Sequence, residues 1–180
     1  MMDPAERRAF VGENHTAVLG YDRHAHGPAM SIVYYVVDGD EILVSTMRAR
    51  GKAKAVNRDP NVSLCVLDGE WPPTYLQVYC DARVDDRFEN VVDAMMRIGE
   101  VMAGRTLDES VRPLVEEGAR REDRVVLRLR PYATFETPPH VESEDDIPNL
   151  ARSVSASIPW DARPWRRQRV PPTPPAHPGG

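Results

Sequence analysis

Residues 30–67 read MSIVYYVVDGDEILVSTMRARGKAKAVNRDPNVSLCVL, and this stretch decides the expected fold. Residues 30–37 are rich in β-branched and aromatic side chains, and residues 41–46 form a second such run. The Asp38-Gly39-Asp40 sequence between them is a strong signal for a β-hairpin. Small and basic residues at helical spacing follow over 48–58, and Asp59-Pro60 ends that helix because a residue before proline avoids the helical region.

Working outward, the pattern predicts a helix over 3–13 and further strands over 16–21, 61–67, 75–84 and 125–135, with helices over 88–103 and 108–120. Consecutive strands joined as antiparallel hairpins favour a closed or nearly closed barrel, and βαβ repeats are absent. We therefore expect a mainly β fold with flanking helices, an antiparallel split β-barrel. The methionine-rich stripe of the 88–103 helix is typical of core or dimer packing.

Composition predicts one barrel domain over 1–137 and a Pro-rich, largely irregular tail over 138–180. Trp160 and Trp165 are unusual in such a tail, and docking on the body and exposure to solvent are equal alternatives. The formal charge of −5 argues against a nucleic-acid partner, which would need a basic face. No apolar run reaches the roughly 18–20 residues that span a bilayer, and no signal peptide is recognisable, so we expect a cytoplasmic protein without a membrane partner. Cys65 and Cys80 predict buried free thiols.

The chain has 23 Lys and Arg residues, and its only two lysines, Lys52 and Lys54, lie within one turn of chain. Ser45 and Thr46 precede them at a strand end, and Arg50 precedes the helix. Hydroxyls, a guanidinium, ammonium groups and the free amides of a helix start together suit a phosphate. A solvated basic helix face is the alternative.

Other candidate sites are weaker. His24 and His26 lack a third metal ligand at suitable spacing, which favours an exposed turn and no metal site. Tyr34, Tyr35 and Tyr79 are possible proton donors, but tyrosines in barrel strands are more often structural, so no catalytic residue is assigned. Signatures of a nucleophile elbow, a P-loop or a Gly-rich dinucleotide site are missing.

The residues that carry a family resemblance are Gly27-Pro28, the strand through Tyr34, Ile42–Thr46, Arg50-X-Lys52 and Asn57–Leu64. In this order and spacing the chain resembles the pyridoxamine 5′-phosphate oxidase-like superfamily over residues 6–135. It most resembles the F-420-dependent branch of flavin/deazaflavin oxidoreductases. The resemblance implies a split β-barrel homodimer with two cofactor sites at the subunit interface.

The resemblance also implies roles for individual residues. The cofactor phosphate would be bound by Ser45, Thr46, Arg50 and Lys52, with Lys54 in the same helix as a further candidate. The strand of Met30, Ser31, Ile32 and Val33 would lie along the cofactor ring. Trp71, Gln77 and Tyr79 would lie near the same site, from the same or the other subunit.

The function that follows is an F-420-dependent oxidoreductase that transfers hydride to a small organic acceptor. An FMN-dependent oxidoreductase, a non-catalytic F-420- or flavin-binding protein and a haem protein on the same barrel are the alternatives. Cys80 stands where family members commonly have glycine. The C-terminal Trp/Arg signature of strict pyridoxamine-phosphate oxidases is missing, which argues against a vitamin B6 oxidase.

Overall fold

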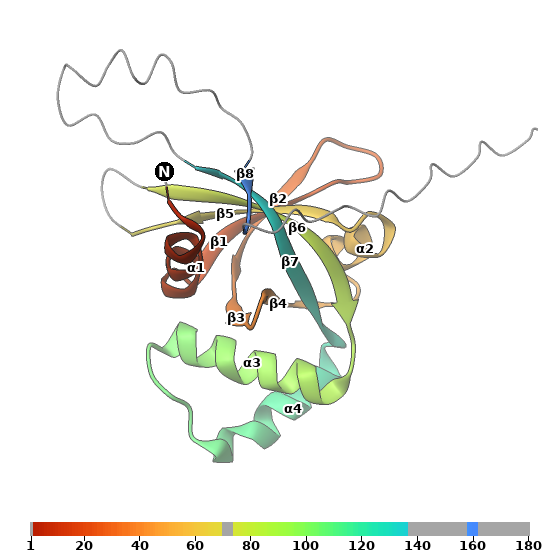
Figure 1. Cartoon of the computed structure of the whole chain (residues 1–180). Coiled ribbons are helices and arrows are strands. Elements are labelled where there is room, and N and C mark those ends of the chain that lie inside the picture. The colour runs from red at the N-terminus through yellow and green to blue at the C-terminus, as the bar shows by residue number, and fades with distance from the viewer. Residues whose placement is uncertain (1, 70–73, 137–157, 162–180) are drawn as a thin grey trace, which may run out of the picture.

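The computed structural model describes residues 2–69, 74–136 and 158–161 (Figure 1). Its described helices are α1 (Pro4–Glu13), α2 (Gly51–Arg58), α3 (Phe88–Ala103) and α4 (Arg112–Arg121), with a 3-10 turn η1 (Glu109–Val111) before α4. Its described strands are β1 (Thr16–Tyr21), β2 (Ala29–Tyr34), β3 (Val36–Asp38), β4 (Glu41–Met47), β5 (Asn61–Leu67), β6 (Tyr75–Asp85), β7 (Arg124–Glu136) and β8 (Ile158–Pro159).

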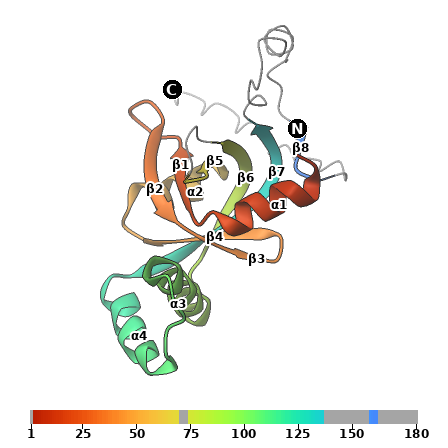
Figure 2. The ribbon, with the colours of Figure 1, turned by 90° about the vertical axis from the view of Figure 1, so that its left-hand side faces the viewer.

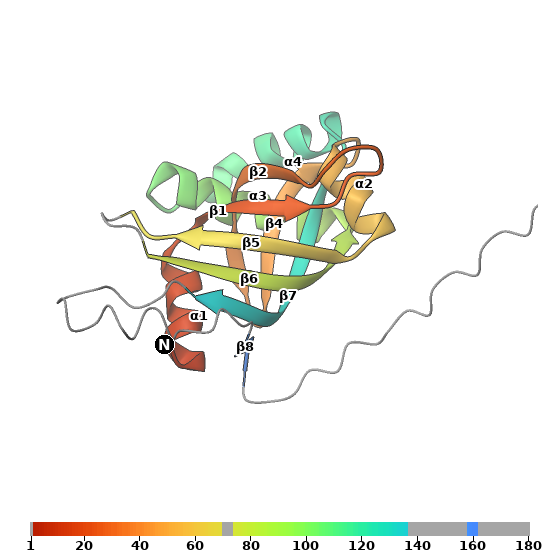
Figure 3. The same ribbon diagram turned by 90° about the horizontal axis from the view of Figure 1, so that it is seen from above.

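These strands form one curled, antiparallel sheet in the order β2-β1-β5-β6-β7-β4-β3, and β8 adds to β7 (Figure 3). Side chains alternate along each strand, so every second residue enters the barrel interior. Leu19, Leu64, Val78 and Leu127 are among the fully buried members of this interior. The expected mainly β, antiparallel split-barrel fold with flanking helices is confirmed.

A second apolar core lies outside the barrel, where α3 and α4 pack below the sheet (Figure 2). The buried face of α3 includes Val91, Val92 and Met96, which pack with Leu43 of β4 and Val126 of β7. The buried apolar face of the methionine-rich helix therefore packs within the protomer. Its expected bounds, 88–103, match the structure.

The single strand expected over 30–37 is wrong, because the chain breaks between β2 and β3 at Tyr35. The Tyr35 side chain is fully buried and its hydroxyl donates to the carbonyl of Val11 at the end of α1 (2.9 Å). Its backbone N–H donates to the carbonyl of His15 rather than to a sheet neighbour (3.0 Å). Contacts with α1 that local sequence does not reveal thus redirect the strand. The hairpin after it is confirmed, and Gly39 supplies the positive φ (59°) of the turn.

A short C-terminal segment returns to the barrel. Ile158 and Pro159 pair with Thr134 and Ala133 of β7, and the buried Trp160 joins the barrel core. The guanidinium of Arg8, from α1, lies over the indole ring of Trp160 (5.9 Å). Docking is therefore the confirmed alternative for Trp160, whereas Trp165 lies outside the described residues.

None of the helices in the described part of the chain has the length and apolar character needed to cross a membrane.

Candidate functional site

The first turn of α2 carries an unusual concentration of unpaired positive charge. Arg50 occupies the N-cap position in an extended conformation and provides no side-chain cap, so the first N–H groups of the helix lack intrahelical partners. Lys52 is half-buried, and its pKa is lowered by burial first and then by the charges of Arg50 and Arg124. Within the described ranges, neither Arg50 nor Lys52 has a carboxylate at ion-pairing distance. An anion bound here would relieve this repulsion.

The neighbouring cation Arg48 behaves differently. Its guanidinium contacts the carboxylates of Asp123 and Asp86, each at 3.2 Å, and these contacts raise its pKa. Arg48 thus ties the chain before α2 to the start of β7. It is engaged in structural ion pairs and is not available as a ligand-binding cation in this structure.

Strand register explains why Arg124 lies beside Lys52. Met47, at the end of β4, pairs with Arg124, and Ser45 pairs with Val126. Ser45 lies two residues before Met47 on β4, so it shares a face of the sheet with Met47 and with Arg124. Thr46 points to the opposite face and is buried. Only Ser45 of the two predicted hydroxyls is on the Arg124 side. Sequence analysis missed Arg124 because it lies far from Lys52 along the chain, and only the pairing of β4 with β7 brings it near.

Two predicted site residues carry buried hydroxyls that lack hydrogen bonds. Ser31 Oγ and Ser45 Oγ are inaccessible to solvent and have no partner among the described residues. A buried polar group without a partner costs about 1–3 kcal/mol, so such groups are uncommon and call for an explanation. Both serines belong to the set assigned to the cofactor. Ser31 faces the barrel interior, so the donor set that fits a phosphate-bearing cofactor is the orphaned Ser45 hydroxyl with the unpaired Arg50 and Lys52.

The β2 strand presents an apolar outer surface at the edge of the sheet. Met30 and Ile32 are 76% and 73% exposed, whereas Ser31 and Val33 face the interior. The end of β2 near Ala29 pairs with Tyr21 of β1, and Tyr21 lies close to Gly51 at the start of α2. The strand expected to lie along a cofactor ring therefore begins beside the cationic turn of α2.

Gln77 and Tyr79 share the outer face of the sheet with Met30 and Ile32, but at a distance. Cross-strand pairing runs from Ile32 to Val18, Cys65 and Gln77 in turn. Three strand spacings separate the first from the last, which corresponds to about 14 Å. Gln77 and Tyr79 thus do not meet β2 within one protomer. Trp71 lies outside the described residues.

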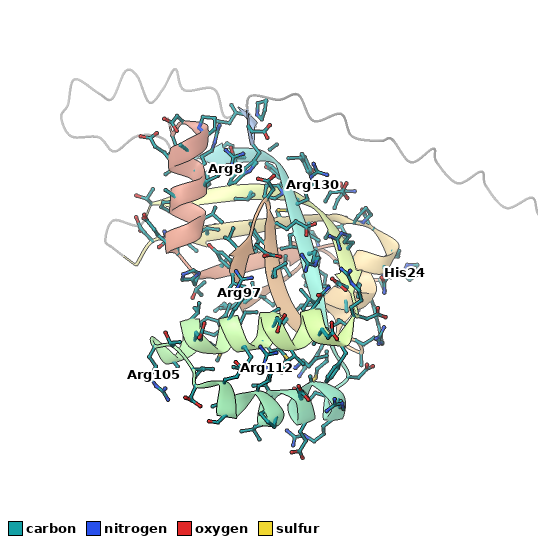
Figure 4. All side chains as sticks on the ribbon, turned by 60° about the horizontal axis from the view of Figure 1, so that its bottom comes forward. Arg8, His24, Arg97, Arg105, Arg112 and Arg130 are labelled. Atoms are coloured by element: carbon teal, nitrogen blue, oxygen red, sulfur yellow. The ribbon has the colours of Figure 1, made fainter. Side chains whose placement is uncertain are left out.

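The other polar features do not resemble an anion site. A cavity of about 450 Å³ lies between α3, α4 and the sheet, but its arginines are paired: Arg97 with Asp38, Arg112 with Asp93, and Arg128 with Glu41 and Asp85. Figure 4 labels Arg97 and Arg112 of this group, beside α3 and α4.

The described chain likewise shows no metal centre. His24 and His26 are exposed in the connection between β1 and β2, as expected, and His24 points away from the body in Figure 4. The described ranges hold no cluster of three His, Cys, Asp or Glu side chains suited to a metal ion. Both cysteines are free thiols; Cys80 is buried as expected, but Cys65 is only half-buried.

A family profile described as "Pyridoxamine 5'-phosphate oxidase" matches residues 4–137, which is most of the chain. The chain belongs to the pyridoxamine 5′-phosphate oxidase family. The match contains strands β1 to β7, α2 and every predicted site residue. A search of curated protein sequences finds no match.

Solved structures confirm the fold of this family member. A conserved hypothetical protein from Mycobacterium tuberculosis is 22% identical with a TM-score of 0.66, covering 79% of this chain and 92% of its own. A protein described as an F-420 reductase is 19% identical with a TM-score of 0.55, covering 71% and 94%. HutZ, a haem storage protein from Vibrio cholerae, is 20% identical with a TM-score of 0.52, covering 72% and 91%. These identities establish a shared fold, and the functions of the neighbours differ.

Proposed function

We propose that this protein is an F-420-dependent oxidoreductase that transfers hydride to a small organic acceptor. The observation that carries the proposal is the pair of unpaired cations, Arg50 and Lys52, at the start of α2, with the orphaned hydroxyl of Ser45 on the neighbouring strand. Cations and a hydroxyl at a helix start are the groups that bind a phosphate. Membership of the pyridoxamine 5′-phosphate oxidase family supports a flavin-type cofactor.

The protein's part in this reaction is to bind and orient. Arg50 and Lys52 would hold the phosphate, Ser45 would donate a hydrogen bond, and the outer face of β2 at Met30 and Ile32 would support the ring. Reduced F-420 held here would supply hydride chemistry, and the acceptor would take up two electrons with the hydride and a proton from solvent. No catalytic side chain is assigned to that step.

Two observations favour F-420 over FMN. F-420 carries an oligoglutamate extension beyond its phosphate, and Lys54 is an exposed cation one helical turn beyond Arg50 without a described carboxylate partner. The similarity to a protein described as an F-420 reductase points the same way. Arg48, the other basic residue near the site, is already paired with Asp86 and Asp123 and contributes nothing to this preference.

The proposed active unit is a homodimer. Met30 and Ile32 leave an apolar outer surface at β2, while Gln77 and Tyr79 lie about three strands away on the same face. A two-fold partner that packs on this face would bring its own Gln77 and Tyr79 toward β2. The predicted contribution of both residues to the cofactor site therefore requires the dimer.

Titration of the purified full-length protein with F-420, FMN and haem tests the proposal. We expect micromolar or tighter binding of F-420, measured by calorimetry, and weaker binding of FMN. Protein purified with stoichiometric FMN would overturn the F-420 assignment in favour of a flavoprotein. Tight haem binding with neither of the other two would favour a haem protein. F-420 binding without reduction of any quinone or nitroaromatic acceptor would indicate a cofactor-binding protein without turnover.

A further inference from the structure

A second concave site lies at the end of the β1–β2 hairpin farthest from α2. It is a cavity of about 390 Å³ between the end of α1, the start of β1 and the end of β5. Figures 1 and 3 place α1 and α2 at opposite ends of the sheet, so this cavity and the cationic turn are separated by the length of the hairpin. We call it the end pocket, and its lining residues that matter here are Glu13, His15, Val18, Ile32, Leu67 and Asp68.

The end pocket borders the surface assigned to the cofactor ring. Ile32 belongs to that surface and also lines the pocket, and Val18, its direct partner on β1, lines it too. Ala29, beside the start of α2, is three residues from Ile32, which is about 10 Å along a strand. A group bound along residues 30–33 therefore lies between the phosphate-binding turn and the end pocket. A molecule that is to accept hydride from this surface can occupy the pocket.

The charge of the end pocket is opposite to that of the α2 turn. Glu13 and Asp68 line it, and its described lining includes no lysine or arginine. Asp68 accepts a hydrogen bond from the backbone N–H of Thr74 (2.9 Å). Without a cation nearby, a carboxylate, sulfonate or phosphate entering this cavity would meet like charge at close range, which opposes binding.

The remaining lining combines aliphatic residues with the polar side chains of Asn14, His15 and Thr16. Val18, Ile32 and Leu67 provide aliphatic surface. His15 packs edge-to-face on Tyr35 (ring centroids 6.1 Å apart), and its Nδ1 atom is buried without a partner in the described part of the chain. Aliphatic surface with a few polar groups is the usual construction of a small-molecule site. It suits a flat ring compound with polar substituents.

We infer that the end pocket binds the hydride acceptor and selects ring compounds that are cationic or uncharged while it rejects anionic ones. This inference rests on the proposed function, because it takes residues 30–33 as the place of the hydride donor. Glu13 and Asp68 set the selectivity through charge, and His15 holds the polar substituent of the acceptor.

Binding of three naphthoquinone probes to the full-length protein tests this inference. The probes share one ring and differ in charge: 1,4-naphthoquinone, its 2-sulfonate and its 2-(trimethylammonio)methyl derivative. Calorimetry is performed with and without F-420. We expect the cationic probe to bind about five- to tenfold more tightly than the sulfonate, with the neutral probe between them. The ¹⁵N chemical shift of His15 Nδ1 should change when a probe binds.

The double variant Glu13→Gln, Asp68→Asn removes both charges and keeps the side-chain shapes; the amide oxygen introduced by Asp68→Asn can still accept from the backbone N–H of Thr74. We expect the cationic and sulfonate probes to bind this variant within twofold of each other, with the affinity of the neutral probe unchanged. Glu117→Gln, at an exposed position of α4, is the matched control and should keep the wild-type order. Circular dichroism verifies that each variant is folded.

Three results would overturn the inference: the sulfonate binding best to the wild type, an unchanged order of affinities in the folded double variant, or no probe binding at all. Failure of the proposed function is distinct from these. If neither F-420 nor FMN binds while the charge order of the probes holds, the proposed function fails and the pocket's selectivity stands. If F-420 binds and no probe binds, the pocket inference alone fails.

Discussion

Replacing Lys52 with methionine should weaken cofactor binding and at the same time stabilise the cofactor-free protein. Methionine keeps most of the aliphatic length of lysine and removes its charge. Lys52 is half-buried beside Arg50 and Arg124 and has no described carboxylate partner, so its charge is unfavourable until an anion binds. A charge-assisted hydrogen bond contributes about 1.5–3 kcal/mol, which corresponds to a loss of roughly 10- to 150-fold in affinity for F-420.

The same substitution removes repulsion between cations in the empty site. The expected gain in unfolding free energy is about 0.5–1 kcal/mol, or a rise in Tm of about 1–4 °C. Because the pKa of Lys52 is lowered in the folded state, the unfolded chain holds that proton more tightly. Wild-type stability should therefore rise as the pH increases toward about 10.4, the ordinary pKa of lysine, and the variant should lack this rise.

Calorimetric titration and thermal melts measure the two effects on one preparation. Lys54→Met, an exposed position in the same helix, is the matched control. We expect it to leave Tm unchanged and to reduce affinity for F-420 by less than fivefold, because Lys54 is assigned only to the oligoglutamate extension. The reasoning is refuted if Lys52→Met keeps wild-type affinity, or if its Tm falls by several degrees, since Lys52 would then be a structural cation.

Three further predictions concern stability and assembly. Asp85→Asn should cost about 3 kcal/mol, because buried Asp85 is paired with Arg128 (2.8 Å). Hydrogen bonds, led by the one from Arg87, hold the folded-state pKa of Asp85 below its usual value. Wild type should therefore lose this part of its stability as the pH falls below about 4, whereas the variant lacks the carboxylate and should not show that loss in acid unfolding. Trp160→Ala should lower the unfolding free energy by about 3 kcal/mol in urea melts, since it empties part of the barrel core. Ile32→Arg should give a monomeric mass in light scattering with an unchanged Tm for the protomer, because Ile32 is exposed in one chain; a dimeric mass would place the interface elsewhere.

The features that sequence predicts well here are those fixed by local interactions. The bounds of α3 follow from its apolar period, and the β3–β4 hairpin follows from Asp38-Gly39, where Gly39 has the positive φ that the turn needs. The cluster at Arg50 and Lys52 is likewise visible because its members lie within one turn of chain. Because a helix start and the residues around it are contiguous in sequence, the charges gathered there can be predicted from the sequence alone.

The features that sequence does not predict depend on long-range register. Arg124 reaches Lys52 only because β7 pairs with β4, and Arg48 is paired with Asp123, just before β7, and with Asp86, just after β6. The break at Tyr35 depends on contacts with α1. The end pocket combines residues from α1, β1, β2 and β5, none of which forms a motif. These arrangements need the pairing of distant strands to be known.

The charges at the two ends of the β1–β2 hairpin give the proposed site a direction. Arg50 and Lys52, which have no carboxylate partner among the described residues, lie at the α2 end, and Glu13 and Asp68 lie at the other, in a described lining that includes no lysine or arginine. A cofactor that carries a phosphate could bind in the reverse orientation only by placing that phosphate against two carboxylates and leaving Arg50 and Lys52 unpaired. The repulsion by the two carboxylates and the unpaired charges of Arg50 and Lys52 both oppose the reverse orientation. Charge alone therefore fixes which edge of a ring on residues 30–33 faces the end pocket. Lys52 should then control how tightly the cofactor binds, whereas Glu13 and Asp68 should control which acceptor it meets.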